Sequence, residues 1–228
     1  MYKATLDRVA QIFSAEPYLG EFSIAREDYF RRTGKVFQDE PMFEIRMTAC
    51  LEWYLLDRLL WDTGIPPIRL YRLKYRETLE ERENEILVGL EKSIHSLFRV
   101  TGQGESRYVV EDLRTLESHE VSAQHPLAGV HRGDLLDARI LELGDDRFFT
   151  DALWIHPSDA APFITEEARK SREKGLETWE TILMGLAYMK LKRERFSHVP
   201  TDQVYDWGMF ERDRFETERR TVDAAGGG

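Results

Sequence analysis

The chain has 228 residues, enough for one large domain or two small ones with a substantial hydrophobic core. Hydrophobic residues make up 42% of it and charged residues 32%, a balance that excludes global disorder. The single cysteine, Cys50, excludes an intrachain disulfide and lies in an apolar run, so we expect it to be buried. No stretch approaches the roughly 20 apolar residues that span a bilayer. The charged N-terminus is unlike a signal peptide, and we therefore expect a cytoplasmic protein that does not enter the membrane.

Residues 1–95 predict a helical region. Apolar residues recur at helical spacing, and Pro and Gly separate the segments. The expected helices cover residues 3–14, 24–33, 41–62 and 68–95, the last with a charged middle that fits a bend or an exposed turn. Residues 53–61 are apolar on nearly all sides, which is typical of a helix buried in a domain or in an oligomer.

Residues 96–157 predict a small β module. Short runs of alternating apolar residues are separated by turns, and no helical pattern lies between them. The five expected strands cover residues 97–100, 107–113, 119–123, 135–143 and 147–156. This order favours five antiparallel strands, arranged as a meander or as an SH3-like barrel.

The segment 158–210 predicts one long helix and a docking segment. Thr165 is a suitable N-cap, and the apolar face continues to about Arg195. The aromatic residues within 201–210 predict that this segment packs on the rest of the chain, and residues 211–228 are expected to form a flexible tail. The fold class is therefore α+β: a helical N-terminal region, a β module and a long C-terminal helix.

The charge distribution argues against nucleic acid as a partner. The formal net charge is −10, and residues 96–157 hold eleven acidic residues against six basic ones. A barrel that binds nucleic acid would carry a basic face. We therefore regard a nucleic-acid-binding module as a disfavoured alternative.

Histidines are the main candidates for a metal site. Three of them are spaced six residues apart, and a fourth lies three residues before an aspartate: His119, His125, His131, His156 and Asp159. Structural zinc sites use closer pairs, so we interpret these histidines as loop residues and expect no metal. A metal-dependent enzyme that uses them is the alternative hypothesis.

Sequence motifs for cofactors and catalysis are missing from the chain. It contains no P-loop, no G-x-G-x-x-G after a strand and no G-x-S-x-G elbow, so we expect no cofactor. Asp57 and Arg58 interrupt the apolar run of residues 53–61. We expect them on an exposed edge of their helix, and a polar feature of a binding cleft is the alternative.

Aromatic side chains are the candidates for binding a partner. Aromatic residues are favoured at interfaces, and those in question are Trp53, Trp61, Tyr205, Trp207 and Phe210. Docking of the last three within the chain is the favoured interpretation. The leading functional hypothesis is a non-catalytic interaction or adaptor protein that binds a protein partner or a second copy of itself. The missing motifs favour this hypothesis without excluding an enzyme.

Overall fold

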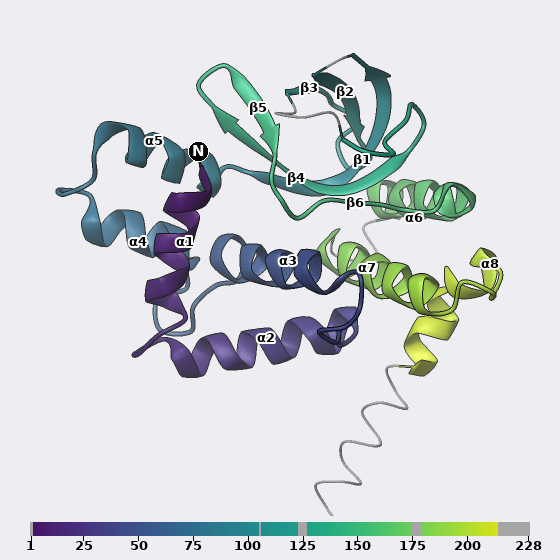
Figure 1. Cartoon of the computed structure of the whole chain (residues 1–228), viewed down its shortest axis with the longest axis horizontal. Coiled ribbons are helices and arrows are strands. Elements are labelled where there is room, and N and C mark those ends of the chain that lie inside the picture. The colour runs from purple at the N-terminus through teal and green to yellow at the C-terminus, as the bar shows by residue number, and fades with distance from the viewer. Residues whose placement is uncertain (1, 105, 123–126, 175–178, 214–228) are drawn as a thin grey trace, which may run out of the picture.

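The computed structural model describes residues 2–104, 106–122, 127–174 and 179–213. These residues combine helices with a six-stranded mixed sheet, which confirms the α+β class in its coarse form. Helices lie below the sheet and at both ends of it (Figure 1). None of the described helices has both the length and the hydrophobicity needed to cross a bilayer.

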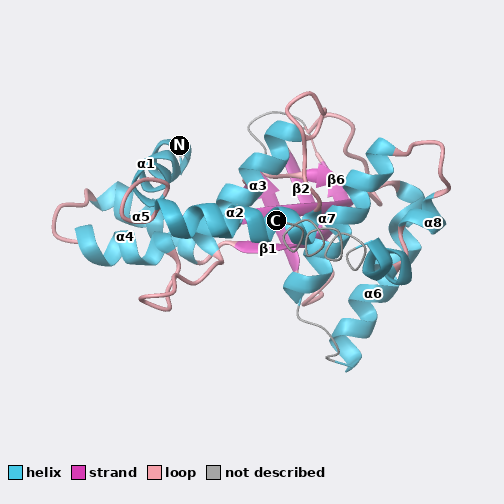
Figure 2. Cartoon of the chain, turned by 90° about the horizontal axis from the view of Figure 1, so that it is seen from below, coloured by secondary structure: helices cyan, strands magenta, loops and turns pink. Residues whose placement is uncertain are grey.

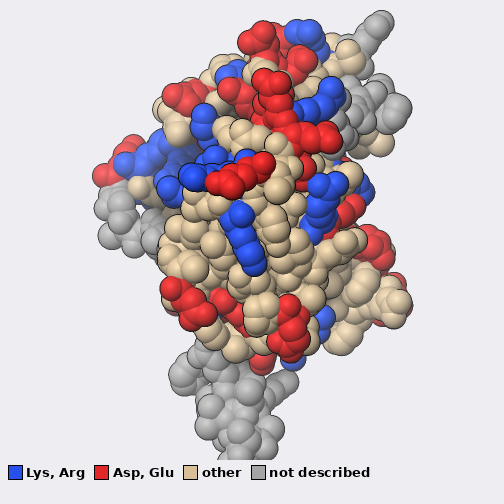
Figure 3. Space-filling view, turned by 90° about the vertical axis from the view of Figure 1, so that its left-hand side faces the viewer, with Lys and Arg blue, Asp and Glu red and all other residues tan. Residues whose placement is uncertain are grey.

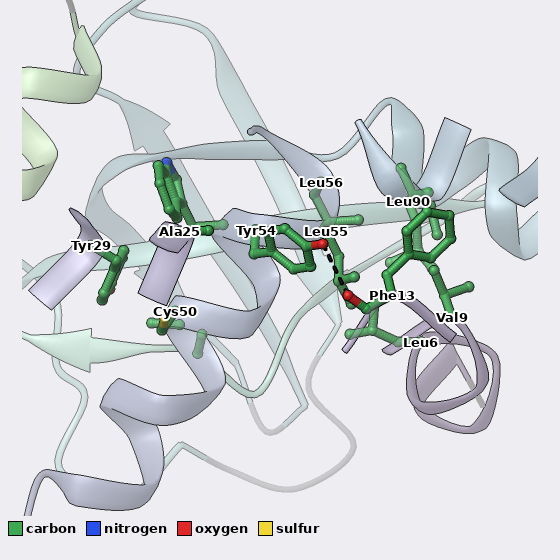
Figure 4. Packing of buried hydrophobic residues seen from close by; sticks show 14 of the residues in the cluster. Leu6, Val9, Phe13, Ala25, Tyr29, Cys50, Tyr54, Leu55, Leu56 and Leu90 are labelled. Atoms are coloured by element: carbon green, nitrogen blue, oxygen red, sulfur yellow. Dashed lines mark hydrogen bonds between the residues drawn. The ribbon is translucent and has the colours of Figure 1, made fainter. Parts of the chain in front are cut away.

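The N-terminal helices pack around a central one. Their bounds are α1 (Tyr2–Phe13), α2 (Leu19–Thr33), α3 (Phe43–Leu56), α4 (Pro67–Tyr75) and α5 (Glu81–Glu91). Helices α1, α2 and α4 all contact α3. In their common core the hydroxyl of Tyr54 donates to the carbonyl of Phe13 at 2.9 Å (Figure 4). Cys50 is buried there as expected, and burial raises the pKa of its thiol to about 12.

Two expected helices are shorter than the sequence predicts. Helix α3 ends at Leu56 and not at residue 62, because the N–H groups of Asp57 and Arg58 both donate to the Trp53 carbonyl and close the last turn. Beyond it Leu59 and Trp61 are 58% and 63% exposed, so the expectation of a buried run was wrong for them. The expected helix 68–95 is two helices, since its charged middle forms the turn between α4 and α5.

The sheet contains β1 (Ile94–Gln103), β2 (Arg107–Asp112), β3 (Ser118–Ser122), β4 (Leu135–Leu143), β5 (Asp146–Phe149) and β6 (Trp154–Ile155). The strand order is β1-β2-β3-β5-β4-β6, with β1 also paired to β4. The pairing of β3 with β5 is parallel, and the others are antiparallel. The sheet is therefore mixed and not a clean barrel, which corrects the expectation of five antiparallel strands.

The expected fifth strand, 147–156, is interrupted in its middle. Strand β5 ends at Phe149, and the N–H of Thr150 donates to the carbonyl of Arg139 at 2.9 Å. A turn over residues 150–153 follows, and β6 then pairs with β4 at Leu136 and Asp137. Residues 147–156 thus pair with two separate stretches of β4. The segment is therefore divided into two short strands, β5 and β6.

The C-terminal part contains η1 (Ser158–Ala160), α6 (Ala161–Lys174), α7 (Trp179–Arg195) and α8 (Thr201–Val204). The single helix expected from Thr165 to Arg195 was wrong, because α6 and α7 are separate and pack on each other. The sequence explains the break: residues 169–175 include no apolar side chain, so the buried face of α6 stops at Ala168. Helix α7 lies against α2 (Figure 2).

The aromatic segment after α7 docks within the chain, as expected. Tyr205 and Phe210 are buried in the cluster formed by α6 and α7, and the indole N–H of Trp207 donates to Glu167 at 2.8 Å. The structure differs at the start of the expected tail, because residues 207–213 are helical. The Tyr188 hydroxyl donates to Asp213 at 2.7 Å. Residues 214–228 lie outside the described part.

Close contact with Trp207 explains Gly185 in the middle of α7. A Cβ at this position would overlap the Trp207 ring. We expect Gly185→Ala to lower the free energy of unfolding by about 1–3 kcal/mol through overpacking, although Ala favours helix. Gly20→Ala in α2 is the control, since a Cβ there has no atom within 4 Å. Urea denaturation measures both variants, and equal stabilities would contradict the close packing.

Candidate functional site

A cleft of about 300 Å³ opens where α3, α7 and the sheet meet. Its apolar walls are Trp53 from the end of α3 and Trp179, Leu183 and Met184 from α7. Four ionisable side chains complete the lining: Asp57 after α3, His95 on β1, Arg114 in the turn after β2 and Glu180 on α7. Four separate segments therefore supply the cleft, and its lining combines aromatic walls with a few polar groups, a combination common in ligand sites.

The alternation of β4 explains why charged side chains lie beneath this cleft. Leu136, Ala138 and Ile140 point into the apolar core enclosed by the sheet. Asp137 and Arg139 therefore lie on the opposite face, because successive strand residues alternate. Both are buried, with 1% and 2% of their surface exposed. Buried charges are costly unless they are paired, so their partners determine the local structure.

Asp137 pairs with His95 at the floor of the cleft. The Oδ1 atom of Asp137 lies 2.8 Å from Nε2 of His95. The His95 side chain is 24% exposed, whereas the carboxylate beneath it is inaccessible. An ionised carboxylate only accepts hydrogen bonds, so Nε2 of His95 carries the proton and donates. The other ring nitrogen, Nδ1, forms no hydrogen bond with a described residue, and the ring as a whole is partly exposed.

Arg139 is held by carboxylates from α3. Its Nη2 donates to Asp57, its Nη1 donates to the Ser93 hydroxyl at 3.0 Å, and its Nε lies 3.6 Å from Oε2 of Glu52. Glu52 also accepts from the Thr150 hydroxyl at 2.9 Å. Burial raises the pKa of the Glu52 carboxyl, while the nearby charge of Arg139 opposes that shift. This cluster joins α3 to β4 and places Asp57 at the edge of the cleft.

Arg46 fixes α3 against α2 and α7. It is fully buried and donates to the carbonyls of Thr33 and Ala187, the latter at 3.0 Å. Its guanidinium also lies over the Trp154 ring, 6.0 Å from the centroid. Burial lowers the pKa of Arg46, but an arginine stays protonated in proteins and keeps these bonds. The wall that α7 contributes to the cleft is thereby held in place.

Glu180 is neutralised at the wall of the cleft. Its Oε1 accepts from Arg32 at 2.7 Å and from the indole N–H of Trp53 at 3.1 Å. Asp57 is likewise paired with Arg139. Arg114 differs from both, because its guanidinium forms no hydrogen bond or ion pair with a described residue, while its backbone N–H donates to Asp112 at 2.8 Å.

The histidines proposed as metal ligands are dispersed. His119 is buried against Phe98 in the sheet, His131 is exposed in a loop, and His125 lies outside the described residues. His156 is buried and bonds to the Tyr205 hydroxyl at 2.9 Å, and burial lowers its pKa to about 4. Asp159 accepts from Thr201. The described residues contain no group of three or more His, Cys, Asp or Glu side chains placed to hold a metal ion.

The aromatic partner-binding candidates occupy three different environments. Trp53 is 4% exposed and lines the cleft, while Trp61 is exposed on the loop after α3. The remaining candidates, Tyr205, Trp207 and Phe210, pack against α6 and α7. The structure therefore does not bring these five side chains together.

Sequence reasoning missed His95 and the buried charges behind it, since His95, Asp137, Arg139 and Glu52 were not candidates. Asp57 is exposed as expected, and it also lines the cleft, which was the alternative. Two charged residues within the buried part of the strand Leu135–Leu143, Asp137 and Arg139, were the available signal. The pairing of Asp137 with His95 could not be inferred, because it depends on the register of β1 with β4.

The ion pairs of Arg139 with Glu52 and Asp57 should stabilise the folded protein. We expect Arg139→Met to lower the free energy of unfolding by about 3–5 kcal/mol, because Glu52 and Asp57 lose their cation. Arg107→Met on β2 is the control, since the ion pair of Arg107 with Glu120 is exposed and contributes about 0–1 kcal/mol. Urea denaturation compares the two variants. Equal losses would show that the buried cluster is not stabilising.

Comparison with known proteins identifies a family. The model of a family of unknown function, DUF7986, matches residues 30–199, which include every residue that lines the cleft. The comparisons with curated proteins and with solved structures found no match. Since the matched region covers most of the 228 residues, the chain belongs to the DUF7986 family.

Proposed function

We propose that the cleft binds a small molecule with an apolar, planar body, and that His95 orients it or exchanges a proton with it. The observation that carries this proposal is the bond between His95, at the floor of the cleft, and the buried carboxylate of Asp137. A volume of about 300 Å³ is at the lower end for ligand sites. The ligand is therefore small, and Trp53 and Trp179 supply flat apolar walls.

The chemistry of His95 supports this proposal. Asp137 accepts the Nε2 proton, which fixes the orientation of the ring and leaves the lone pair of Nδ1 available to a ligand. A carboxylate behind the ring also stabilises the imidazolium that forms when Nδ1 accepts a proton. The pair therefore has the components of a general acid or base. Burying Asp137 costs folding energy, and a functional role accounts for keeping it.

The alternatives that involve metal or nucleic acid gain no support from the described side chains. The described histidines proposed as ligands lie apart from one another. On the face that carries α1, α4 and α5, basic and acidic residues are interspersed (Figure 3). Arg8 there pairs with Glu83, and Arg72 pairs with Glu91. A nucleic-acid surface would instead present uncompensated basic residues.

A histidine pair tests the binding proposal. We expect aromatic fragments that bind the wild type to lose at least about tenfold in affinity in His95→Gln, the magnitude for losing a hydrogen bond of about 1.4 kcal/mol. His131→Gln is the matched control, because His131 is exposed in a loop and does not line the cleft. Ligand-observed NMR titrations give the affinities. Fragments that bind both variants equally well would contradict a site at His95.

A protein interaction through the loop after α3 is the second candidate function. Leu59 and Trp61 are both exposed there, and Trp61 is a residue type that interfaces favour. Arg58 lies against the rings of both Trp53 and Trp61, with centroid distances of 5.6 Å and 5.8 Å. The backbone N–H of Trp61 donates to Glu21 of α2 at 2.9 Å. These contacts hold the loop in a shape that a second copy of the chain could recognise.

Sedimentation analysis over a range of protein concentrations tests this candidate. We expect a concentration-dependent dimer that the double variant Leu59→Ser, Trp61→Ser converts to a monomer, because the exposed apolar contact is lost. Phe196→Ser, which changes another exposed apolar residue at the end of α7, serves as the control. A wild type that stays monomeric at every concentration would rule out self-association through this loop.

A further inference from the structure

We infer that the ligand of the cleft carries a carboxylate beside its apolar body, and that Arg114 binds this carboxylate. The inference rests on the proposed function, because it assigns the chemical class of the ligand to the same site. It follows from the charges of the lining, from the way the turn that carries Arg114 is held, and from the unpaired polar groups of the cleft.

One cation of the lining, Arg114, takes part in no ion pair with a described residue. Asp57 is paired with Arg139, and Glu180 with Arg32. His95 is bonded to Asp137. Arg114 is exposed, and no ion pair joins its guanidinium to a described carboxylate. A ligand with a single negative charge would compensate this guanidinium, whereas a dianion would also meet repulsion from the two carboxylates of the lining.

The turn that carries Arg114 is held firmly at its backbone. Its N–H donates to Asp112, a buried residue whose Oδ1 also accepts from the Ser96 hydroxyl at 2.5 Å. The neighbouring residue, Leu113, donates its N–H to the Leu97 carbonyl at 2.8 Å, and its own carbonyl accepts from Arg172. The backbone of Arg114 is thus fixed, so binding a ligand would have to order only its side chain.

The guanidinium of Arg114 would be complemented by a ligand group that accepts hydrogen bonds. A guanidinium presents only donors, in a planar fork that matches both oxygens of a carboxylate. The indole N–H of Trp179, another residue of this lining, is buried and has no acceptor among the described residues. Trp53 differs, since its N–H already donates to Glu180. A carboxylate next to an apolar body would therefore match both the guanidinium of Arg114 and the aromatic walls.

Matched pairs of probes test the inference. The panel contains benzoate, phenylacetate and indole-3-acetate, each with its primary amide, and affinities are measured by NMR titration. We expect at least one carboxylate to bind the wild type roughly tenfold more tightly than its amide, because a hydrogen bond to a charged group contributes more than one to a neutral group. Raising the salt concentration should weaken binding of the carboxylate and leave that of the amide unchanged.

Two arginine variants distinguish the possible outcomes. Arg114→Gln should abolish the preference for carboxylate, and Arg132→Gln, which changes an exposed arginine outside the cleft, should retain it. If amides and carboxylates bind equally well and both depend on His95, the inference is overturned and the proposed function stands. A preference that survives in Arg114→Gln also overturns the inference. Binding of no probe by the wild type would overturn both.

Discussion

The structure depends on two charged residues of β4 that lie beneath α3. Asp137 and Arg139 occupy the face of the strand opposite its apolar core, and both are buried. Charges in such a position destabilise a fold unless each has a partner. Arg139 is paired with Glu52 and Asp57, and Asp137 with His95. Meeting this requirement determines how α3 lies across the sheet and which side chains reach the cleft.

The same pairings shape the cleft as a site for chemistry. His95 has one ring nitrogen bonded to a buried carboxylate, so its ring is oriented before any ligand arrives. Pairing with arginines neutralises Asp57 and Glu180. Arg114 differs from these groups, because no ion pair with a described residue holds its guanidinium. The same contacts therefore stabilise the buried charges and orient the side chains of the cleft.

The cleft depends on distant parts of the chain, because they hold α7, which forms one of its walls. Arg46 bonds the backbone of α7 to that of the segment after α2, and the segment that includes Trp207 packs against Gly185 on α7. Trp179 and Glu180 reach the cleft because α7 is held in this position. Residues from both ends of the chain thereby support a site formed by its middle.

Local pattern alone determined the α+β class, the positions of the first helices, the burial of Cys50 and the docking of the segment 201–210. Each follows from the spacing of apolar residues along a short stretch. Only the tertiary structure decided that 147–156 forms two strands, that 165–195 forms two helices, and that Asp57 faces a cleft. It also decided the pairing of His95 with Asp137, which are 42 residues apart. Periodicity reports which face of an element is buried, whereas the partner of a buried charge depends on strand register and helix packing between distant segments.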